Sequence, residues 1–262
     1  MEYITSRKNP ICSHLRKLAS SKSYREETCE MLCDSPKLLE EAGLWGFGVK
    51  TLLYTEGVEL PPFDDRGTRI IQVTEHVMES VSPMKTPQGV VFTCMSMGRQ
   101  PPERLEPGRY LVLDGVQDPG NVGAILRTAD AFDCDEVFLL PGCADINSPK
   151  TIRAAMGVHF RRVIYQCTLE ELTALLQGAG IPMYAAALGK DTADVRALDL
   201  SNAAVVIGSE GRGVSQAVLE VCSGTLSIPM SRRCESLNAA AAAAVILWEM
   251  ARETLAGTGP EQ

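Results

Sequence analysis

The sequence lacks any apolar run of the roughly 18 residues that a membrane-spanning helix needs. Its first ten residues, MEYITSRKNP, also lack the apolar segment of a secretory signal. Hydrophobic residues make up 45% of the chain and charged residues 22%, which is ordinary for a soluble globular protein. We therefore expect a cytoplasmic protein without a membrane partner, and 262 residues allow one or two domains.

Paired cysteines of the CxxC kind are also absent. The nine cysteines are scattered along the chain, and the nearest two are Cys29 and Cys33. A structural zinc site needs closer pairs of ligands, and a disulfide framework is typical of small secreted chains. We therefore predict that most of these thiols are buried as small apolar groups and that the protein holds no metal.

Two nucleotide-binding signatures are missing. The glycine-rich segment GSEGRG at 208–213 does not have the GxGxxG spacing of a dinucleotide-binding turn, and it contains no P-loop lysine. This disfavours a nicotinamide-dependent oxidoreductase, which a parallel α/β pattern alone would allow. Taken by itself, the segment is equally compatible with a tight turn between a strand and a helix.

The chain has no excess of positive charge. Its net charge is −8 and its pI is about 5.1, which argues against a protein that coats nucleic acid without specificity. The first 25 residues are an exception, because six basic residues stand against Glu2 alone and give a local net charge of +5. They form either a solvated helix face or a surface for phosphates, and they are Arg7, Lys8, Arg16, Lys17, Lys22 and Arg25.

The chain divides near GRQPPERLEPG (98–108), whose prolines, glycines and charges are typical of a linker. We predict a smaller α/β domain over 1–98, a linker over 99–108 and a second domain over 109–262. In the first domain, the expected helices lie at 10–20, at 26–42 and, capped by Thr74, at 75–82, and the expected strands at 49–54, 69–73 and 89–95.

The second domain alternates strands with helices, which predicts a mainly parallel sheet covered on both faces. The expected strands are 109–115, 136–140, 162–165, 182–188, 203–208 and 225–230, and the expected helices are 121–132, 148–157, 168–180 and 236–255. In such sheets, ligands bind beyond the carboxyl ends of the strands. The segments that follow the strands are therefore where we expect chemistry.

Three such segments are distinctive. DPGNVGAILRTADAF (118–132) carries Arg127, whose guanidinium could extend into solvent, pair with Asp130 or Asp133, or bind a phosphate. VVIGSEGRGVS (205–215) lets the backbone approach a ligand through its glycines. IPMSRRCESLNAAAAAA (228–244) leads into an alanine-rich helix, whose free amides can hold a polar or anionic group.

In this order, NVGAILRTADAF, GSEGRGVS, and IPM followed by ESLNAAAAAA resemble the three signature motifs of the SpoU (TrmH-type) RNA ribose methyltransferases, in the SPOUT superfamily. The resemblance covers 109–253 closely. The first hundred residues resemble the family's RNA substrate-binding domain more weakly, through ITSRKNPICSHLRKL near the start and SPMKTPQGVVF near the end.

The resemblance implies a C-terminal α/β trefoil knot that binds S-adenosyl-L-methionine, a homodimer whose sites are completed across the interface, and methyl transfer to a ribose 2′-hydroxyl of RNA. The residues implied for the cofactor are Gly208, Gly211, Gly213, Ile228, Met230 and Leu237. The residues implied for catalysis are Arg127, Asn121, Glu210, Ser236 and Asn238, with Glu210 either acting directly or holding Arg127. Because arginine hardly ever loses its proton, we expect Arg127 to clamp a phosphate and stabilise the developing oxyanion rather than act as a base.

The expected RNA contacts are Arg7, Lys8, Arg16, Lys17, Arg232 and Arg233. Arg232 stands where the family commonly has glycine, so it could either touch RNA or crowd the cofactor loop. The separate N-terminal domain favours ribosomal RNA as the substrate. The alternatives are transfer RNA, an antibiotic-resistance methylation of ribosomal RNA, and a non-catalytic RNA-binding assembly factor on the same fold.

Overall fold

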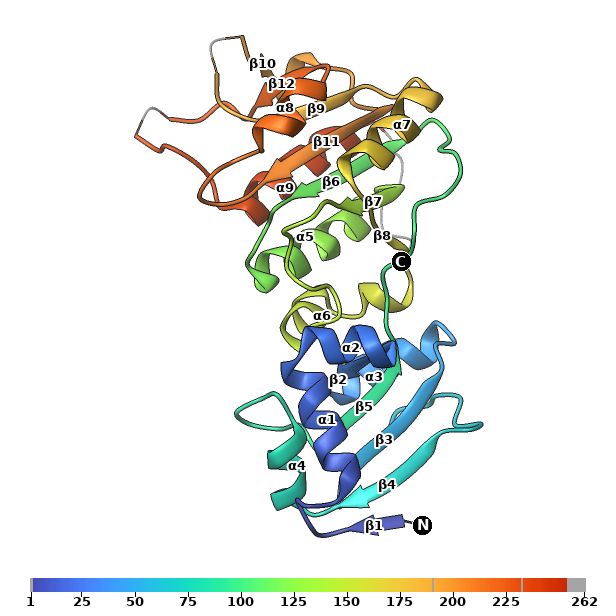
Figure 1. The fold of residues 1–262 in the computed structure, drawn as a ribbon. Coiled ribbons are helices and arrows are strands. Elements are labelled where there is room, and N and C mark those ends of the chain that lie inside the picture. The colour runs from blue at the N-terminus through green and yellow to red at the C-terminus, as the bar shows by residue number, and fades with distance from the viewer. Residues whose placement is uncertain (1, 190, 232, 254–262) are drawn as a thin grey trace. The chain divides into compact units, whose positions relative to one another are not determined.

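A computed structural model describes residues 2–189, 191–231 and 233–253. The chain forms two compact units (Figure 1). The first unit comprises the chain up to Met97 together with Asp145–Arg161, and the second comprises Gly98–Ala144 and the chain from Arg162 onward. The chain therefore passes between the units three times, and residues 145–161 fold with the first unit although the motif-bearing sequence surrounds them.

A five-stranded sheet with the order β1-β4-β3-β5-β2 forms the centre of the first unit. Its β1, β4 and β3 are parallel to one another, whereas β5 runs antiparallel to both β3 and β2. The strands are β1 (Glu2–Ile4), β2 (Glu30–Cys33), β3 (Val49–Thr55), β4 (Arg69–Val73) and β5 (Val90–Met95). The helices are α1 (Pro10–Ser20), α2 (Lys22–Thr28), α3 (Pro36–Leu44), α4 (Glu75–Val81), α6 (Pro149–Ala155) and the short 3₁₀ helix η1 (Val158–Phe160).

The single helix expected at 26–42 is wrong, because the chain forms α2, β2 and α3 there. Cys29 adopts a left-handed backbone (φ 52°) that ends α2. The next residues pair with β5 as a strand. A new helix then begins at Pro36, where the Ser35 hydroxyl accepts a hydrogen bond from the Leu38 amide. Proline at the first helical position starts a helix but cannot continue one.

Residues 145–161 are joined to the first unit by packing and by buried charge. Ile152 and Phe160 belong to its apolar core, where the rings of Phe160 and Phe92 are stacked with centroids 6.5 Å apart. The Arg25 guanidinium lies 2.6 Å from the Asp145 carboxylate, and both side chains are nearly inaccessible to solvent. These contacts explain why the segment follows the first unit rather than its sequence neighbours.

The second unit contains a seven-stranded sheet with the order β10-β12-β9-β11-β6-β7-β8, in which every neighbouring pair is parallel. The strands are β6 (Arg109–Asp114), β7 (Glu136–Leu139), β8 (Ile164–Gln166), β9 (Met183–Ala186), β10 (Ala193–Asp194), β11 (Ala203–Gly208) and β12 (Gly224–Ser227). The helices are α5 (Pro119–Ala131), α7 (Leu169–Ala179), α8 (Gln216–Val221), α9 (Ala239–Ala251) and the 3₁₀ helix η2 (Val195–Ala197).

Helices cover both faces of this sheet, as the alternation predicted. Val112 and Val206 face one side, where they share an apolar core with Leu172 of α7 and Val218 of α8. The two-residue period of a strand places Ile207 on the opposite face, where α9 packs against β11 and α5. None of the helices in the described residues is long and apolar enough to cross a bilayer.

The parallel register brings several strand ends to one edge of the sheet. Gly208, the last residue of β11, pairs with Asp114, the last residue of β6. Leu226 near the end of β12 likewise pairs with Ala186, the last residue of β9. The three segments singled out in the sequence therefore start from the same edge.

Candidate active site

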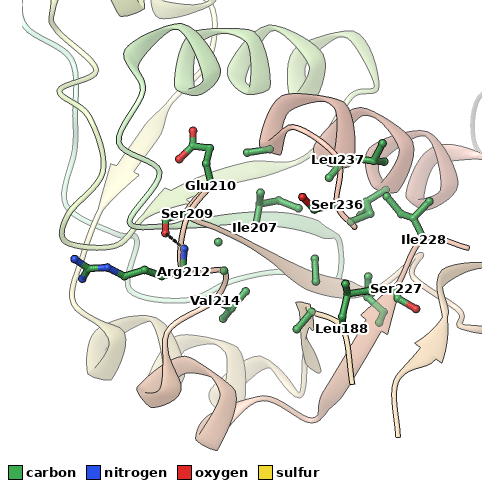
Figure 2. A pocket seen from close by; sticks show the side chains of 18 of the residues that line it. Leu188, Ile207, Ser209, Glu210, Arg212, Val214, Ser227, Ile228, Ser236 and Leu237 are labelled. Atoms are coloured by element: carbon green, nitrogen blue, oxygen red, sulfur yellow. Dashed lines mark hydrogen bonds between the residues drawn. The ribbon is translucent and has the colours of Figure 1, made fainter. Parts of the chain in front are cut away.

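A cavity of about 410 Å³ lies at this edge of the second unit (Figure 2). Much of its wall is apolar, and these residues include Leu188, Ile207, Leu226, Ile228, Leu237 and Ile246. Its polar side chains include Ser209, Glu210, Ser227 and Ser236. Mostly apolar walls with a few polar groups, and a volume within the roughly 300–1,000 Å³ of small-molecule sites, suit an organic cofactor of the size of S-adenosylmethionine.

The loop after β11 is folded tightly against its own strand. Ser209 and Gly213 exchange backbone hydrogen bonds of 3.0 and 2.9 Å, and Gly213 has a φ of +69°. A Cβ atom on Gly208 would lie 2.1 Å from the Gly213 carbonyl carbon and 2.2 Å from the Val214 nitrogen. These glycines are therefore required by the backbone, which brings the loop close enough to line the cavity.

The apolar strand β6 ends in a carboxylate, Asp114, and the structure shows what this side chain does. Its side chain is buried, and its Oδ2 atom accepts a hydrogen bond of 2.6 Å from the Ser215 amide. This bond connects the end of β6 to the far side of the cavity loop. The sequence places Asp114 in the expected strand 109–115 but shows no role for its side chain, because Ser215 lies 101 residues away.

Three predicted residues form a hydrogen-bonded chain. The Asn238 Oδ1 atom accepts from the amides of Ala240 and Ala241 at the start of α9. Its Nδ2 group donates to Asn121 Oδ1 at 3.1 Å, and Asn121 Nδ2 donates to Glu210 Oε1 at 2.5 Å. Because backbone amides only donate, the helix fixes the orientation of both asparagines. Glu210 is thus held through two amide groups by the N-terminus of α9.

Arg127 is exposed on α5 and is not among the described residues that line the cavity. The predicted alternative that it pairs with Asp130 or Asp133 is wrong for the described residues, where the Arg127 side chain makes no ion pair and both carboxylates pair with Arg162, at 2.7 and 2.6 Å. Within the described residues Glu210 does not hold Arg127 either, since its carboxylate accepts a hydrogen bond from Asn121 instead. Within the described part of the chain, the Arg127 guanidinium makes no ion pair and remains available for a ligand.

The residues predicted for the cofactor are mostly assembled by the fold. The predicted residues that line the cavity are Gly208, Gly213, Ile228, Met230, Leu237 and, from the catalytic set, Glu210 and Ser236. Gly211 belongs to the same loop but is not among the described lining residues. Leu188 and Ser227 were not predicted, although both follow or end strands in the way that the sheet rule requires.

The basic residues near the N-terminus fall into three groups. Lys8 and Lys17 are exposed, with the Lys17 ammonium 5.3 Å from the centre of the Tyr24 ring. Arg16 donates to the carbonyl of Arg7, whose own guanidinium contacts Glu79. Arg25 is buried, so it contributes to the local charge of the sequence but not to the surface.

The basic residues of the third segment are only partly described. Arg233 is exposed and contacts the hydroxyl of Ser231. The predicted RNA contact Arg232 lies outside the described residues.

The thiol of Cys143, which lies after the end of β7, is unreactive. Burial, with the negative charges of Asp114 and Glu210, raises the pKa of Cys143 to about 11. Its sulfhydryl donates to the carbonyl of Leu113 at 3.2 Å. A protonated thiol is a poor nucleophile, which argues against covalent chemistry at Cys143. The described residues contain no cluster of three or more histidine, cysteine or acidic side chains that could hold a metal ion.

Two family profiles match the chain. The profile of the SpoU rRNA Methylase family matches residues 108–248, and that of the MRM3-like substrate binding domain matches residues 9–91. The 23S rRNA (guanosine(2553)-2′-O)-methyltransferase RlmP of Bacillus subtilis is 33% identical to this chain, covering 95% of this chain and 99% of RlmP.

Solved structures agree with this assignment. An AdoMet-bound rRNA methyltransferase from Sinorhizobium meliloti is 30% identical, with a TM-score of 0.84 over 97% of this chain and 98% of its own. The SpoU methyltransferase AviRb from Streptomyces viridochromogenes, in complex with AdoMet, is 26% identical, with a TM-score of 0.83 over 96% of this chain and 100% of its own. The motifs, the fold and these similarities together show that the chain belongs to the SpoU rRNA methylase family and is a methyltransferase.

Proposed function

We propose that this protein transfers a methyl group from S-adenosyl-L-methionine to the 2′-hydroxyl of a ribose in ribosomal RNA. The observation that carries the proposal is the chain of hydrogen bonds from α9 through Asn238 and Asn121 to Glu210, at the rim of a cavity suited to the cofactor. The similarity to RlmP, which is named as a 23S rRNA 2′-O-methyltransferase, supports ribosomal RNA as the substrate class.

S-adenosylmethionine supplies an electrophilic sulfonium methyl group when it is bound. The residues of this chain must align a ribose oxygen with that methyl group and ease the loss of the hydroxyl proton. Asn121 and Asn238 have amide hydrogens left for the ribose, and Ser236 lies at the same rim. Arg127 stabilises the developing oxyanion and clamps the adjacent phosphate. No residue in this scheme requires a metal.

The exposed position of Arg127 supports a homodimer whose sites are completed across the interface. The same side of the second unit exposes apolar side chains on α9, with Trp248 53% and Val245 40% accessible. The Trp248 ring meets the Phe132 ring edge to face at a centroid distance of 5.7 Å. We infer that a second copy covers this surface, so that Arg127 of one copy serves the cavity of the other.

We also propose roles for the two parts of the chain. Residues 1–98 form the RNA substrate-binding domain, in which Lys8, Lys17 and Arg16 contact phosphates. Residues 109–262, apart from the segment 145–161 that folds with the first unit, form the methyltransferase domain, in which we expect the family's trefoil knot. The protein is cytoplasmic and meets its RNA there.

Transfer of a radiolabelled methyl group to RNA tests this function. Total RNA from cells that lack this protein is incubated with the enzyme and methyl-labelled S-adenosylmethionine, and ribosomal and transfer RNA are then separated. We expect label in ribosomal RNA at one position that resists alkaline cleavage. Label in transfer RNA would change the substrate class, and binding of the cofactor without transfer to any fraction would favour the non-catalytic assembly factor.

A further inference from the structure

The cavity loop carries an arginine that the mechanism above does not use. Arg212 lines the rim of the cavity, two residues after Glu210, and its side chain is exposed. Its guanidinium extends away from the interior of the cavity, on the side opposite to Ile228 and Leu237 (Figure 2). It therefore points away from the space where the cofactor fits.

Arg212 has no ion pair within the described residues, although a carboxylate stands two residues before it. Two other arginines stand two residues after a carboxylate, and both fold back onto it, as Arg66 does on Asp64 and Arg196 on Asp194, with shortest distances of 2.6 and 2.5 Å. Glu210 has the same spacing to Arg212, but its carboxylate is bound by Asn121. Within the described residues, Arg212 has no acidic partner, so its positive charge is not neutralised by the protein.

The backbone that presents Arg212 is fixed from several sides. The Arg212 amide donates to Ser209 Oγ at 3.2 Å, within the loop closed by the bonds between Ser209 and Gly213. Asp114 holds the next part of the loop through the Ser215 amide. Because the backbone is already fixed, binding of an anion costs less conformational entropy of the loop. A planar guanidinium in such a place suits a phosphate, which it can bind with two parallel hydrogen bonds.

We propose that Arg212 binds a phosphate of the RNA next to the methylated ribose and so positions that ribose at the cavity. This inference rests on the proposed function, because it needs RNA as the substrate. Together with Arg127, it gives the acidic protein a local positive charge at the site itself. Since Arg212 follows Glu210, the loop that lines the cofactor cavity also contacts the substrate.

The test is the steady-state kinetics of methyl transfer to an unmodified 23S rRNA transcript, with RNA binding measured over a series of salt concentrations. We expect Arg212→Ala to raise the KM for RNA by about tenfold, as for loss of one charged hydrogen-bonded contact. The slope of log Kd against log salt concentration should fall by about one. Arg212→Lys should retain the slope but recover the KM only in part, because lysine cannot bind in the bidentate manner.

Arg196→Ala is the matched control, since Arg196 lies in the same unit and pairs with Asp194. It should leave the KM for RNA, the KM for S-adenosylmethionine and the dependence of RNA binding on salt unchanged. Unchanged RNA kinetics and an unchanged slope in Arg212→Ala would overturn the inference alone. A raised Kd for S-adenosylmethionine with unchanged RNA binding would also overturn it, by assigning Arg212 to the cofactor carboxylate. Failure of the wild-type enzyme to methylate RNA would overturn the proposed function, and this inference with it.

Discussion

The two compact units use their charged residues in opposite ways. In the first unit, buried charged side chains are paired, as Arg25 is with Asp145 and as the buried Asp34 is with the partly exposed Arg153. In the second unit, the charges at the cavity are exposed, and Arg127 and Arg212 have no acidic partner within the described residues. Paired buried charges stabilise a fold, whereas unpaired charges beside a cavity are available to a ligand.

In the first unit, the surroundings of Glu30 and His159 determine whether each side chain is charged. Burial alone would raise the pKa of Glu30, but hydrogen bonds from Lys50 and His14 outweigh it and lower that pKa. Burial lowers the pKa of His159 to about 4. The Nε2 atom of His159 donates to the carbonyl of Ile146 at 2.7 Å, while its Nδ1 atom is buried without a partner. A second proton on this ring would therefore have no acceptor.

The largest expected effect concerns the boundary between the units. A chain that begins at residue 98 would carry Ile152 and Phe160 without the core that buries them, at a cost of about 2 kcal/mol for each side chain. We expect this chain to aggregate, as judged by size-exclusion chromatography and circular dichroism. Replacing residues 145–161 with a glycine–serine segment of equal length should restore a soluble protein. A folded, monodisperse chain from residue 98 without that replacement would contradict the division into these units.

The next effect concerns the unpaired charge on α5. Arg127→Ala should lower kcat for methyl transfer by about 1,000-fold, as for loss of a group that stabilises developing charge. The Kd for S-adenosylmethionine, measured by calorimetry, should stay the same, because Arg127 does not line the cavity among the described residues. Loss of cofactor affinity with turnover retained would contradict the assigned role.

Breaking a buried pair in the first unit should affect stability rather than chemistry. Arg25→Ala leaves Asp145 buried and unpaired, so the free energy of unfolding should fall by about 3–5 kcal/mol. Urea denaturation measures this change, and kcat at a temperature where the variant is folded should remain that of the wild type. Removal of the exposed pair by Arg196→Ala should leave the denaturation midpoint unchanged. A reduced kcat in folded Arg25→Ala would contradict the claim that this pair contributes only to stability.

The smallest expected effect is a dependence of stability on pH from His159. Its pKa is about 4 in the folded protein and about 6.5 when unfolded, so only the unfolded chain takes up the proton between these values. The contribution of His159 is complete above pH 6.5 and falls by at most about 3 kcal/mol as the pH drops to about 4. His159→Gln should remove this part of the pH dependence in urea denaturation, and an identical pH profile in both proteins would refute it.

Much of the second unit could be predicted from the sequence because its signals are local and mutually consistent. Buried strands alternate with capped helices, and α7, at the expected helix 168–180, begins with a capping box formed by Thr168 and Glu171. The parallel direction of the strands alone predicts that the site lies at the edge formed by their carboxyl ends. The glycine pattern at 208–213 is a weak signal in the sequence. The structure explains it, because in the folded loop Gly208 lies too close to Gly213 for any side chain to fit.

The parts that escaped prediction depend on contacts between distant residues. The strand β2 was taken as helix because its partner β5 lies about sixty residues away in the sequence, and only that pairing makes it a strand. The affiliation of residues 145–161 depends on Arg25 and on a distant apolar core. The partner of Glu210 could not be foreseen either, since Asn121 is 89 residues away.

The nature of the methylated product tests the central claim most directly. An unmodified 23S rRNA transcript is treated with S-adenosylmethionine and either the wild-type enzyme or Arg127→Ala, then digested to nucleosides and analysed by mass spectrometry. We predict one 2′-O-methylated nucleoside with the wild-type enzyme and almost none with the variant. A nucleoside methylated on its base, or equal amounts of product from both proteins, would contradict the account.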